Sequence, residues 1–281
     1  MFLALGARRD QITMCDSRGV VTTRRTDLNP VKREFATSRP VTTLREALVG
    51  ADVFLGVSTA GVLDADIYGP SQPKMFGVEG YLPEAAEEEG VDRIIPAEAG
   101  DIRLMSIGFF IKPTDALLWR GAMATNALKQ LIHQTKWGTL DFLLLDLPPG
   151  TGDVHLSIIN ELRIDAAVIV STPQQVAVAD VLRGVEMFRN PNVRIPVAGI
   201  IENMAWFTPE ELPDHRYYLF GRGGAHRFAE EHGVDFLGEV PIVQSIMEGS
   251  EEGRPAAGID PRVEKWYREI ADKIVGKVMK S

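Results

Sequence analysis

Cysteine is almost absent from this sequence, since its 281 residues include one. One thiol cannot form a disulfide within the chain, nor alone hold a zinc ion or an iron–sulfur cluster, because those sites need several ligands. Basic residues are in the minority, with 30 Lys and Arg against 39 Asp and Glu. The net charge of −9 disfavours a non-specific nucleic-acid binder, because phosphate contacts require Lys and Arg.

Long apolar runs are missing as well. No stretch approaches the roughly 20 apolar residues that cross a bilayer. The short apolar start, Met1 to Leu5, precedes Arg8 and Arg9, whereas a signal peptide carries its positive charge first. The sequence therefore predicts no membrane partner and a cytoplasmic location. A composition with 45% hydrophobic and 25% charged residues is typical of a globular protein.

From about residue 100 onward, short apolar runs alternate with helical patterns. The expected strands are Leu104–Ile111, Phe142–Leu147, Ala166–Ser171, Val197–Ile201 and Phe236–Val240. The expected helices are Trp119–Gln134, His155–Leu162, Val176–Phe188, Ala225–His232 and Pro261–Met279. This alternation predicts an α/β fold, a mostly parallel sheet with helices on both faces. Ligands of such sheets bind at the carboxyl ends of the strands, so functional residues should follow each strand.

The strongest chemical signal is the segment Leu143–Asp153, LLLDLPPGTGD. An apolar strand brings Asp146 to its carboxyl end, where an acidic residue can hold Mg²⁺ through water beside a nucleotide. The glycine-rich residues Gly150, Thr151 and Gly152 follow, and such a segment can move when a γ-phosphate is present. The structural alternative is a turn that ends the strand and an acidic residue that caps the next helix.

Two further segments place polar groups near strand ends. In Val62–Ser71, VLDADIYGPS, Asp64 and Asp66 lie two apart and would point to the same side of a continuous strand. One would orient an attacking water and the other would assist the metal; a turn built from Asp, Gly and Pro is the alternative. In Val197–Phe207, VAGIIENMAWF, a strand ends in Asn203, whose amide either reads a base edge or occupies a turn.

In this order, the three segments resemble the Mrp/ApbC family of deviant-Walker P-loop ATPases, which carry and deliver iron–sulfur clusters. Further matching blocks are WRGAM at 119–123, STPQQ at 171–175, GEVPI at 238–242 and EGRP at 252–255. The resemblance implies a P-loop NTPase-like domain that hydrolyses ATP with Mg²⁺. It also implies a homodimer, with iron–sulfur client or scaffold proteins as partners.

The resemblance also implies roles for individual residues. Asp64 and Asp66 belong to the first switch and act in catalysis, whereas Asp146 binds Mg²⁺ through water. The residues implied in nucleotide binding are Gly150, Thr151, Gly152, Asn203 and Pro241.

Two family features are missing from the sequence. A P-loop surrounds phosphates with glycine N–H groups and then supplies a Lys and a Ser or Thr, but no G-x-x-x-x-G-K-[ST] occurs in this chain. We therefore expect a fold without the P-loop strand–helix unit, and weakened ATP binding. Without that Lys, Asp64, Asp66 and Asp146 would face one crevice uncompensated, and at least one pKa should rise. No Cys-x-x-Cys follows Asn203 and Met204, where many members bind a shared [4Fe–4S] cluster, so no iron–sulfur ligand is assigned.

Residues 3–61 resemble a different family, the NAD-binding domain of malic enzymes. The strand ITMCDS would end in Asp16, the acidic residue that contacts the adenosine ribose there. The sequence therefore predicts two domains, a malic-enzyme-like fragment over 1–61 and a truncated Mrp-type domain over 62–281.

The join between the two resemblances has a geometric consequence. Only four residues separate the apolar runs Asp52–Val57 and Val62–Ala65. A parallel crossover needs a dozen residues or more, so these runs cannot be neighbouring parallel strands. We expect Val53–Val57 to fill part of the position of the missing central strand.

Three functions remain open at this point. The first is an iron–sulfur cluster carrier ATPase with impaired ATP binding and hydrolysis. The second is a non-catalytic dimerising scaffold that keeps the family's partner surface, and the missing Lys and glycines favour it. The third is a fragment of an NAD-dependent malic enzyme, which the N-terminal sixty residues alone support.

Overall fold

The computed structural model describes residues 15–16, 19–26, 28, 32–33, 36–40, 60–66, 69, 71–88, 90–110 and 121–279. The chain forms two compact units, one of residues 1–60 with 138–142 and one of residues 61–137 with 143–281. The expected strand Val53–Val57 lies outside the described residues.

The described part of the first unit is small and locally paired. β1 (Cys15–Asp16) and β2 (Gly19–Val20) form an antiparallel hairpin. The backbone N–H of Thr37 donates to the carbonyl of Val21 at 2.9 Å, which joins the residue after β2 to a segment further along the chain. Val20, Val21 and Leu28 are buried there. Short-range backbone pairing around a few aliphatic side chains therefore holds this part together.

The second unit carries a sheet in the order β6-β7-β3-β8. Its strands are β3 (Ala60–Asp64), β6 (Ala97–Ala99), β7 (Ile102–Ser106) and β8 (Phe142–Asp146). The helices near it are α3 (Gln72–Met75), α4 (Gly121–Gln134) and α5 (Asp153–Glu161), and β4 (Ala85–Glu88) pairs with β5 (Val91–Ile94) in a hairpin. Leu63, Leu104, Leu128 and Ile158 are buried in one apolar cluster, so strands and helices share a core.

The expected strand over Leu104–Ile111 is wrong in its second half. β7 ends at Ser106, and Ile107–Phe109 form the short 3₁₀ helix η3. The reason is local, because the Oγ of Ser106 accepts a hydrogen bond from the N–H of Gly108 at 3.0 Å. This cap satisfies a backbone donor at the start of the turn and stops the extended chain.

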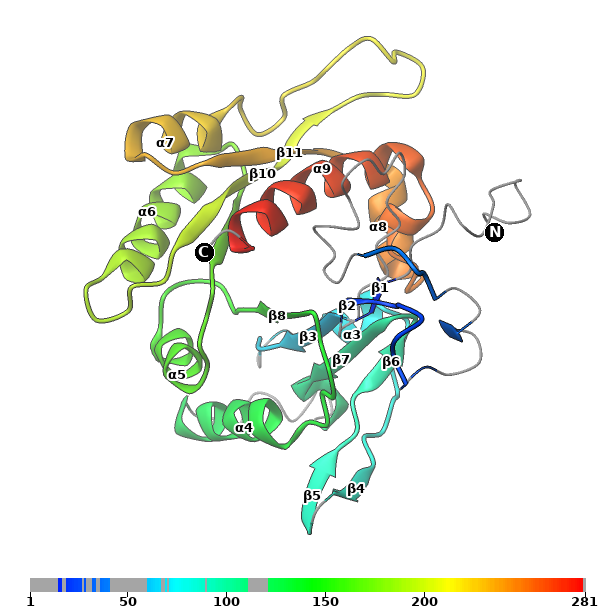
Figure 1. Ribbon diagram of the computed structural model, residues 1–281. Coiled ribbons are helices and arrows are strands. Elements are labelled where there is room, and N and C mark those ends of the chain that lie inside the picture. Colours follow the sequence, from blue (N-terminus) through cyan, green and yellow to red (C-terminus); the bar gives the residue numbers. More distant parts are fainter. Residues whose placement is uncertain are drawn as a thin grey trace. The chain divides into compact units, whose positions relative to one another are not determined.

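The second unit also contains a fully parallel sheet in the order β11-β10-β9. Its strands are β9 (Ala167–Ser171), β10 (Val197–Phe207) and β11 (Phe236–Ile242). The helices α6 (Gln175–Arg189) and α7 (Gly224–His232) pack on one face, and α9 (Pro261–Val278) packs on the other (Figure 1). The adjacent residues Ile200 and Ile201 demonstrate this, since the first packs with α6 and α7 and the second with α9.

A glycine allows α9 to lie close to β11. A Cβ on Gly238 would stand 2.8 Å from Cγ1 of Ile270. The expectation of a mostly parallel sheet with helices on both faces is confirmed, and the expected helices in the described region are present with small shifts at their ends.

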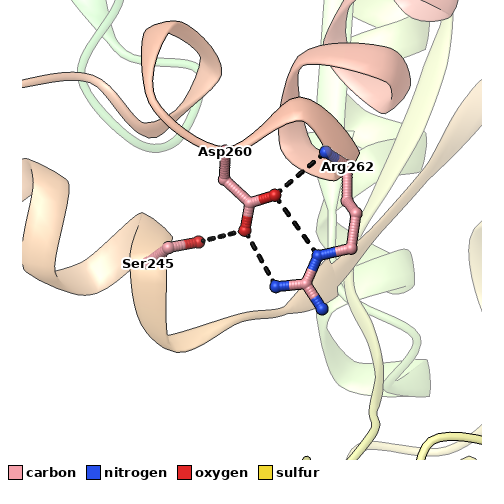
Figure 2. A network of polar contacts seen from close by, with 3 residues as sticks. All are labelled: Ser245, Asp260 and Arg262. Carbon is pink, nitrogen blue, oxygen red and sulfur yellow. Dashed lines mark hydrogen bonds and ion pairs between the residues drawn. The ribbon is translucent and has the colours of Figure 1, made fainter.

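One helix that the sequence analysis missed is α8 (Gln244–Glu251). Its Ser245 donates to Oδ2 of Asp260 at 2.9 Å, and the same carboxylate pairs with Arg262 and accepts from its backbone N–H (Figure 2). Asp260 is the N-cap of α9, so one carboxylate begins α9 and links it to α8. None of the described helices combines the length and the apolar character that a membrane span needs.

Candidate functional site

Asp64 lies at the carboxyl end of β3, as expected, but it is buried, with 1% of its surface exposed. Oδ2 accepts a hydrogen bond from the hydroxyl of Ser106 at 2.9 Å, and Oδ1 accepts one from the N–H of Asp66 at 3.3 Å. Burial raises the pKa of Asp64 from 3.8 to about 6, and the charge of Asp146 adds to this rise. The expected rise of a carboxylate pKa is confirmed here, although desolvation contributes more than charge repulsion.

Asp66 is in a different environment from Asp64. β3 ends at Asp64, so the rule that residues two apart share a side of a strand does not apply to this pair. Asp66 is half-buried, and its Oδ1 accepts from the N–H of Gly69 at 3.2 Å. The backbone N–H of Asp66 contacts the carboxylate of Asp64, but the Asp64 side chain is buried whereas that of Asp66 is partly exposed.

Asp146 ends β8 and lies beside the end of β3. The N–H of Ala65 donates to the backbone carbonyl of Asp146 at 2.9 Å, which joins the two strand ends. The carboxylate of Asp146 is exposed and accepts from Nε2 of Gln72 at 2.5 Å. The predicted proximity of Asp64 and Asp146 is therefore present in the structure.

Gln72 and Ser106 are the two residues of this site that the sequence analysis missed. Gln72 opens α3; its backbone N–H donates to Asp64 at 3.4 Å, while its side chain reaches Asp146. The position of Gln72 directly after the sequence Gly-Pro-Ser was the available signal. Ser106 comes from a strand 42 residues away from Asp64 in sequence, and no local pattern announces it.

The glycine-rich segment after β8 is exposed. Gly150 has a φ of +94°, a backbone conformation that favours glycine, and a Cβ there or on Gly152 would meet no atom within 4 Å. Gly152 is the N-cap of α5 and offers no side-chain cap. The space around this segment is compatible with the predicted contact to a ligand.

His155 lies in the first turn of α5, directly after that segment. It is buried, and among the described residues its Nδ1 is a buried polar atom without a hydrogen-bond partner. Burial lowers the pKa of His155, so the ring is neutral near pH 7.

The expectation that a strand ends in Asn203 is wrong. β10 continues to Phe207, and Asn203 pairs with Val240 inside the parallel sheet. Regular pairing is interrupted just after it, where Met204 has a φ of 56° and its N–H donates to Oδ1 of Asn203 at 2.9 Å. A break in the ladder, rather than the end of a strand, sets the orientation of this amide.

Pro241 lies in β11, one residue after the partner of Asn203. The structure thus brings Asn203 and Pro241 onto neighbouring strands of one sheet, and Asp64 and Asp146 onto strand ends of the other. Among the described residues, no hydrogen bond joins Asp64 or Asp146 to Asn203 or Pro241.

A buried carboxylate next to Asn203 fixes the neighbouring helix. Glu202 accepts from the N–H of Gly223 at 3.2 Å and from that of Ala225 at 2.7 Å, at the start of α7. An anion at a helix N-terminus is favoured by the helix dipole. α7 starts close to the loop after β9, because a Cβ on Gly224 would lie 2.1 Å from the carbonyl oxygen of Pro173.

The carboxylate oxygens at the ends of β3 and β8 suit a hard cation such as Mg²⁺. Within the described ranges, no group of three or more His, Cys, Asp and Glu is arranged to hold a metal by itself. Mg²⁺ is usually bound by one or two carboxylates together with water and substrate phosphates, which is what an exposed carboxylate such as that of Asp146 can supply.

The fold is an α/β fold of the P-loop NTPase-like class. The septum site-determining protein MinD from Pyrococcus horikoshii, solved with Mg-ADP, has a TM-score of 0.55 at 17% identity, over 77% of this chain and 83% of that one. A nucleotide-binding protein from Archaeoglobus fulgidus, solved in complex with ADP, has a TM-score of 0.59 at 34% identity, over 71% of this chain and 75% of that one.

Sequence comparison assigns the family. Residues 55–278 match the family model described as "ParA: NUBPL iron-transfer P-loop NTPase". The mouse "Iron-sulfur cluster transfer protein NUBPL" is 41% identical over 223 residues, which make up 79% of this chain and 68% of that protein. The chain therefore belongs to the NUBPL iron-transfer P-loop NTPase family.

Two other relatives show how much of the family the chain spans. The "Iron-sulfur cluster carrier protein" of Aquifex aeolicus is 44% identical over 225 residues, 79% of this chain but 60% of that protein. The "Iron-sulfur cluster transfer protein NUBPL" of Dictyostelium discoideum is 36% identical over 276 residues, 96% of this chain and 80% of that protein. That alignment includes residues predicted to be malic-enzyme-like, and none of these comparisons supports such a fragment.

Proposed function

We propose that this chain carries iron–sulfur clusters and that its carboxylate site binds Mg²⁺ with a nucleotide. The observation that carries the proposal is the family match over residues 55–278. The names of the Aquifex and mouse relatives support a cluster as the cargo, and the ADP bound to the Archaeoglobus protein supports a nucleotide ligand.

The proposed roles follow the positions of the residues. Asp146, exposed at the end of β8, would hold Mg²⁺ through water, and the ion would neutralise phosphate charge. Asp64 and Asp66, at the end of β3, would form the first switch. The remaining nucleotide contacts are proposed for Gly150, Thr151, Gly152, Asn203 and Pro241.

Nucleotide binding and hydrolysis are proposed to be impaired. The chain has no G-x-x-x-x-G-K-[ST] motif, so the Lys that would compensate Asp64 and Asp146 is missing from the sequence. No described Lys or Arg contacts either of these two carboxylates. Titration with Mg-ATP, followed by calorimetry and phosphate release, tests this; saturable micromolar binding with turnover would contradict it.

Cluster binding cannot use the usual ligands. The chain has one cysteine, Cys15, and a [4Fe–4S] cluster takes four thiolates. Anaerobic reconstitution of the chain alone with iron and sulfide should therefore leave no stoichiometric brown chromophore. We expect the cluster to be held with a partner protein or by unusual ligands.

The decisive experiment measures cluster transfer. A cluster-loaded scaffold protein is mixed anaerobically with an apo-acceptor, with and without this chain, and the acceptor's visible circular dichroism is followed. A carrier accelerates acceptor loading, and Asp146→Asn removes any dependence of that rate on Mg-ATP. If the chain leaves the rate unchanged, the carrier proposal fails.

The second candidate is a non-catalytic scaffold that dimerises and keeps the family's partner surface. The missing phosphate-binding motif favours it. It predicts a dimer whose association does not respond to Mg-ATP. Sedimentation of the chain with and without the nucleotide would measure this.

The homodimer, the cytoplasmic location and the malic-enzyme-like interpretation of residues 3–61 stay predictions. Titration with NAD tests the last of these, since Asp16 would then contact an adenosine ribose.

A further inference from the structure

Gln72 contacts the two carboxylates that end neighbouring strands. Its backbone N–H donates to Oδ2 of Asp64 at 3.4 Å, and its side-chain Nε2 donates to Oδ2 of Asp146 at 2.5 Å. Asp64 and Asp146 come from β3 and β8 and are 82 residues apart in the sequence. Gln72, as the first residue of α3, is therefore the polar connection between both strand ends and this helix.

The atoms of this contact fix its polarity. A carboxylate accepts hydrogen bonds and cannot donate them when ionised, so the amide group facing Asp146 must be the NH₂ and not the carbonyl. The bond takes one lone pair of Oδ2, so Oδ1 of Asp146 can accept a further ligand such as a hydrated cation. An amide bonded in this way favours one orientation of the carboxylate.

We infer that Gln72 is a positioning residue for the proposed metal site, which orients the Asp146 carboxylate toward a hydrated divalent cation. Carboxylates that bind metals are commonly held by a second hydrogen bond, and loss of such a partner costs about 10- to 100-fold in metal affinity. The inference rests on the proposed function of Asp146 and adds a residue to that site. Gln72 itself touches neither metal nor nucleotide.

The test uses Mn²⁺ as the probe, because its free form is counted directly by electron paramagnetic resonance. The full 281-residue chain is titrated at pH 7.5, in parallel with Gln72→Leu, Asp146→Asn and the double variant. Leu has nearly the volume of Gln and no donor. The matched control is Gln244→Leu, since Nε2 of Gln244 donates to Oε1 of Glu248 at 2.6 Å within α8 and contacts neither Asp64 nor Asp146 in a hydrogen bond.

We expect Gln72→Leu to weaken Mn²⁺ binding about tenfold, and Gln244→Leu to leave it within twofold. Asp146→Asn should abolish binding at this site, and adding Gln72→Leu to it should change nothing further. The Tm of Gln72→Leu should stay within about 2 °C of the unchanged chain, because the contact lies at the surface.

Three results would overturn the inference. The first is that Gln72→Leu binds Mn²⁺ as tightly as the unchanged chain or more tightly. The second is that Gln72→Leu lowers the Tm so far that partial unfolding explains its lost Mn²⁺ affinity. The third is that the unchanged chain shows no saturable Mn²⁺ binding. Mn²⁺ binding requires neither a cluster nor ATP. A chain that fails in cluster transfer can therefore still show the expected pattern, which separates the two failures.

Discussion

The hydroxyl of Ser106 donates a hydrogen bond to the carboxylate of Asp64 at 2.9 Å, and both side chains are buried. The same oxygen of Ser106 accepts from the N–H of Gly108, so it serves the end of β7 and the end of β3 together. A hydrogen bond to a charged group that is removed from water is worth more than one at the surface.

Replacing Ser106 with Ala should destabilise the chain by about 1–3 kcal/mol, because Asp64 and the N–H of Gly108 both lose a buried partner. Urea unfolding at pH 7.5 measures this. Ser171→Ala is the matched control, since Ser171 is also buried and, in the described part of the chain, its hydroxyl bonds one group, the neighbouring carbonyl of Thr172. Equal losses from the two variants would contradict the prediction.

The raised pKa of Asp64 predicts a pH dependence of stability. Its pKa rises from 3.8 to about 6, so between these values the folded state binds a proton that the unfolded state has released. Stability is therefore contributed fully below pH 3.8 and is lost as the pH rises through about 6, with an upper limit of about 3 kcal/mol.

Asp64→Asn removes this titration. Compared with the unchanged chain, the variant should have similar stability at pH 4 and gain about 1–3 kcal/mol in relative terms by pH 7.5. Urea unfolding at several pH values gives both curves. Parallel curves across this range would show that Asp64 does not titrate as expected.

Gly224→Ala should destabilise the chain by about 2 kcal/mol or more. Its Cβ would lie 2.1 Å from the backbone oxygen of Pro173, so the start of α7 must move and its bonds to Glu202 must lengthen. Gly276→Ala is the control, because nothing lies within 4 Å of its Cβ inside α9, where Ala is favoured by about 0.5–1 kcal/mol. Thermal unfolding compares the two, and a loss at Gly276 alone would refute the packing argument.

Asp260→Ala should cost about 1–2 kcal/mol, because α9 loses its N-cap together with the links to Ser245 and Arg262. Asp260→Ser should cost less, since it keeps the cap and loses only the two links.

The pH dependence of the stability that Asp260 contributes has the opposite sign to that of Asp64. The Arg262 guanidinium holds the pKa of Asp260 well below its usual range, so the contribution of Asp260 is present near neutral pH and is lost in acid. Chemical unfolding at pH 7 and pH 3 checks this: the stability lost on Asp260→Ala should be smaller at pH 3 than at pH 7, and a loss of equal size at both pH values would contradict the prediction.

The parts that could be predicted are those set by local patterns. The apolar runs that became β8, β9 and β11 and the helical spacing of α6 and α9 follow from the side-chain periods of strands and helices. Asp146 at a strand end followed from the same pattern. The end of β7 at Ser106 and the continuation of β10 through Asn203 did not, because a cap and a break in pairing decide them.

The sequence by itself determined the α/β alternation and the carboxylates near the ends of two strands, since both depend on residues close together in the chain. It also determined that the chain has one thiol and no G-x-x-x-x-G-K-[ST] motif, since these are properties of the sequence alone. Only the tertiary structure decided that Asp64 is buried against Ser106, that Gln72 reaches Asp146, and that Glu202 caps α7. These contacts join residues 21 to 74 positions apart, and packing of the elements, rather than any local preference, brings them together.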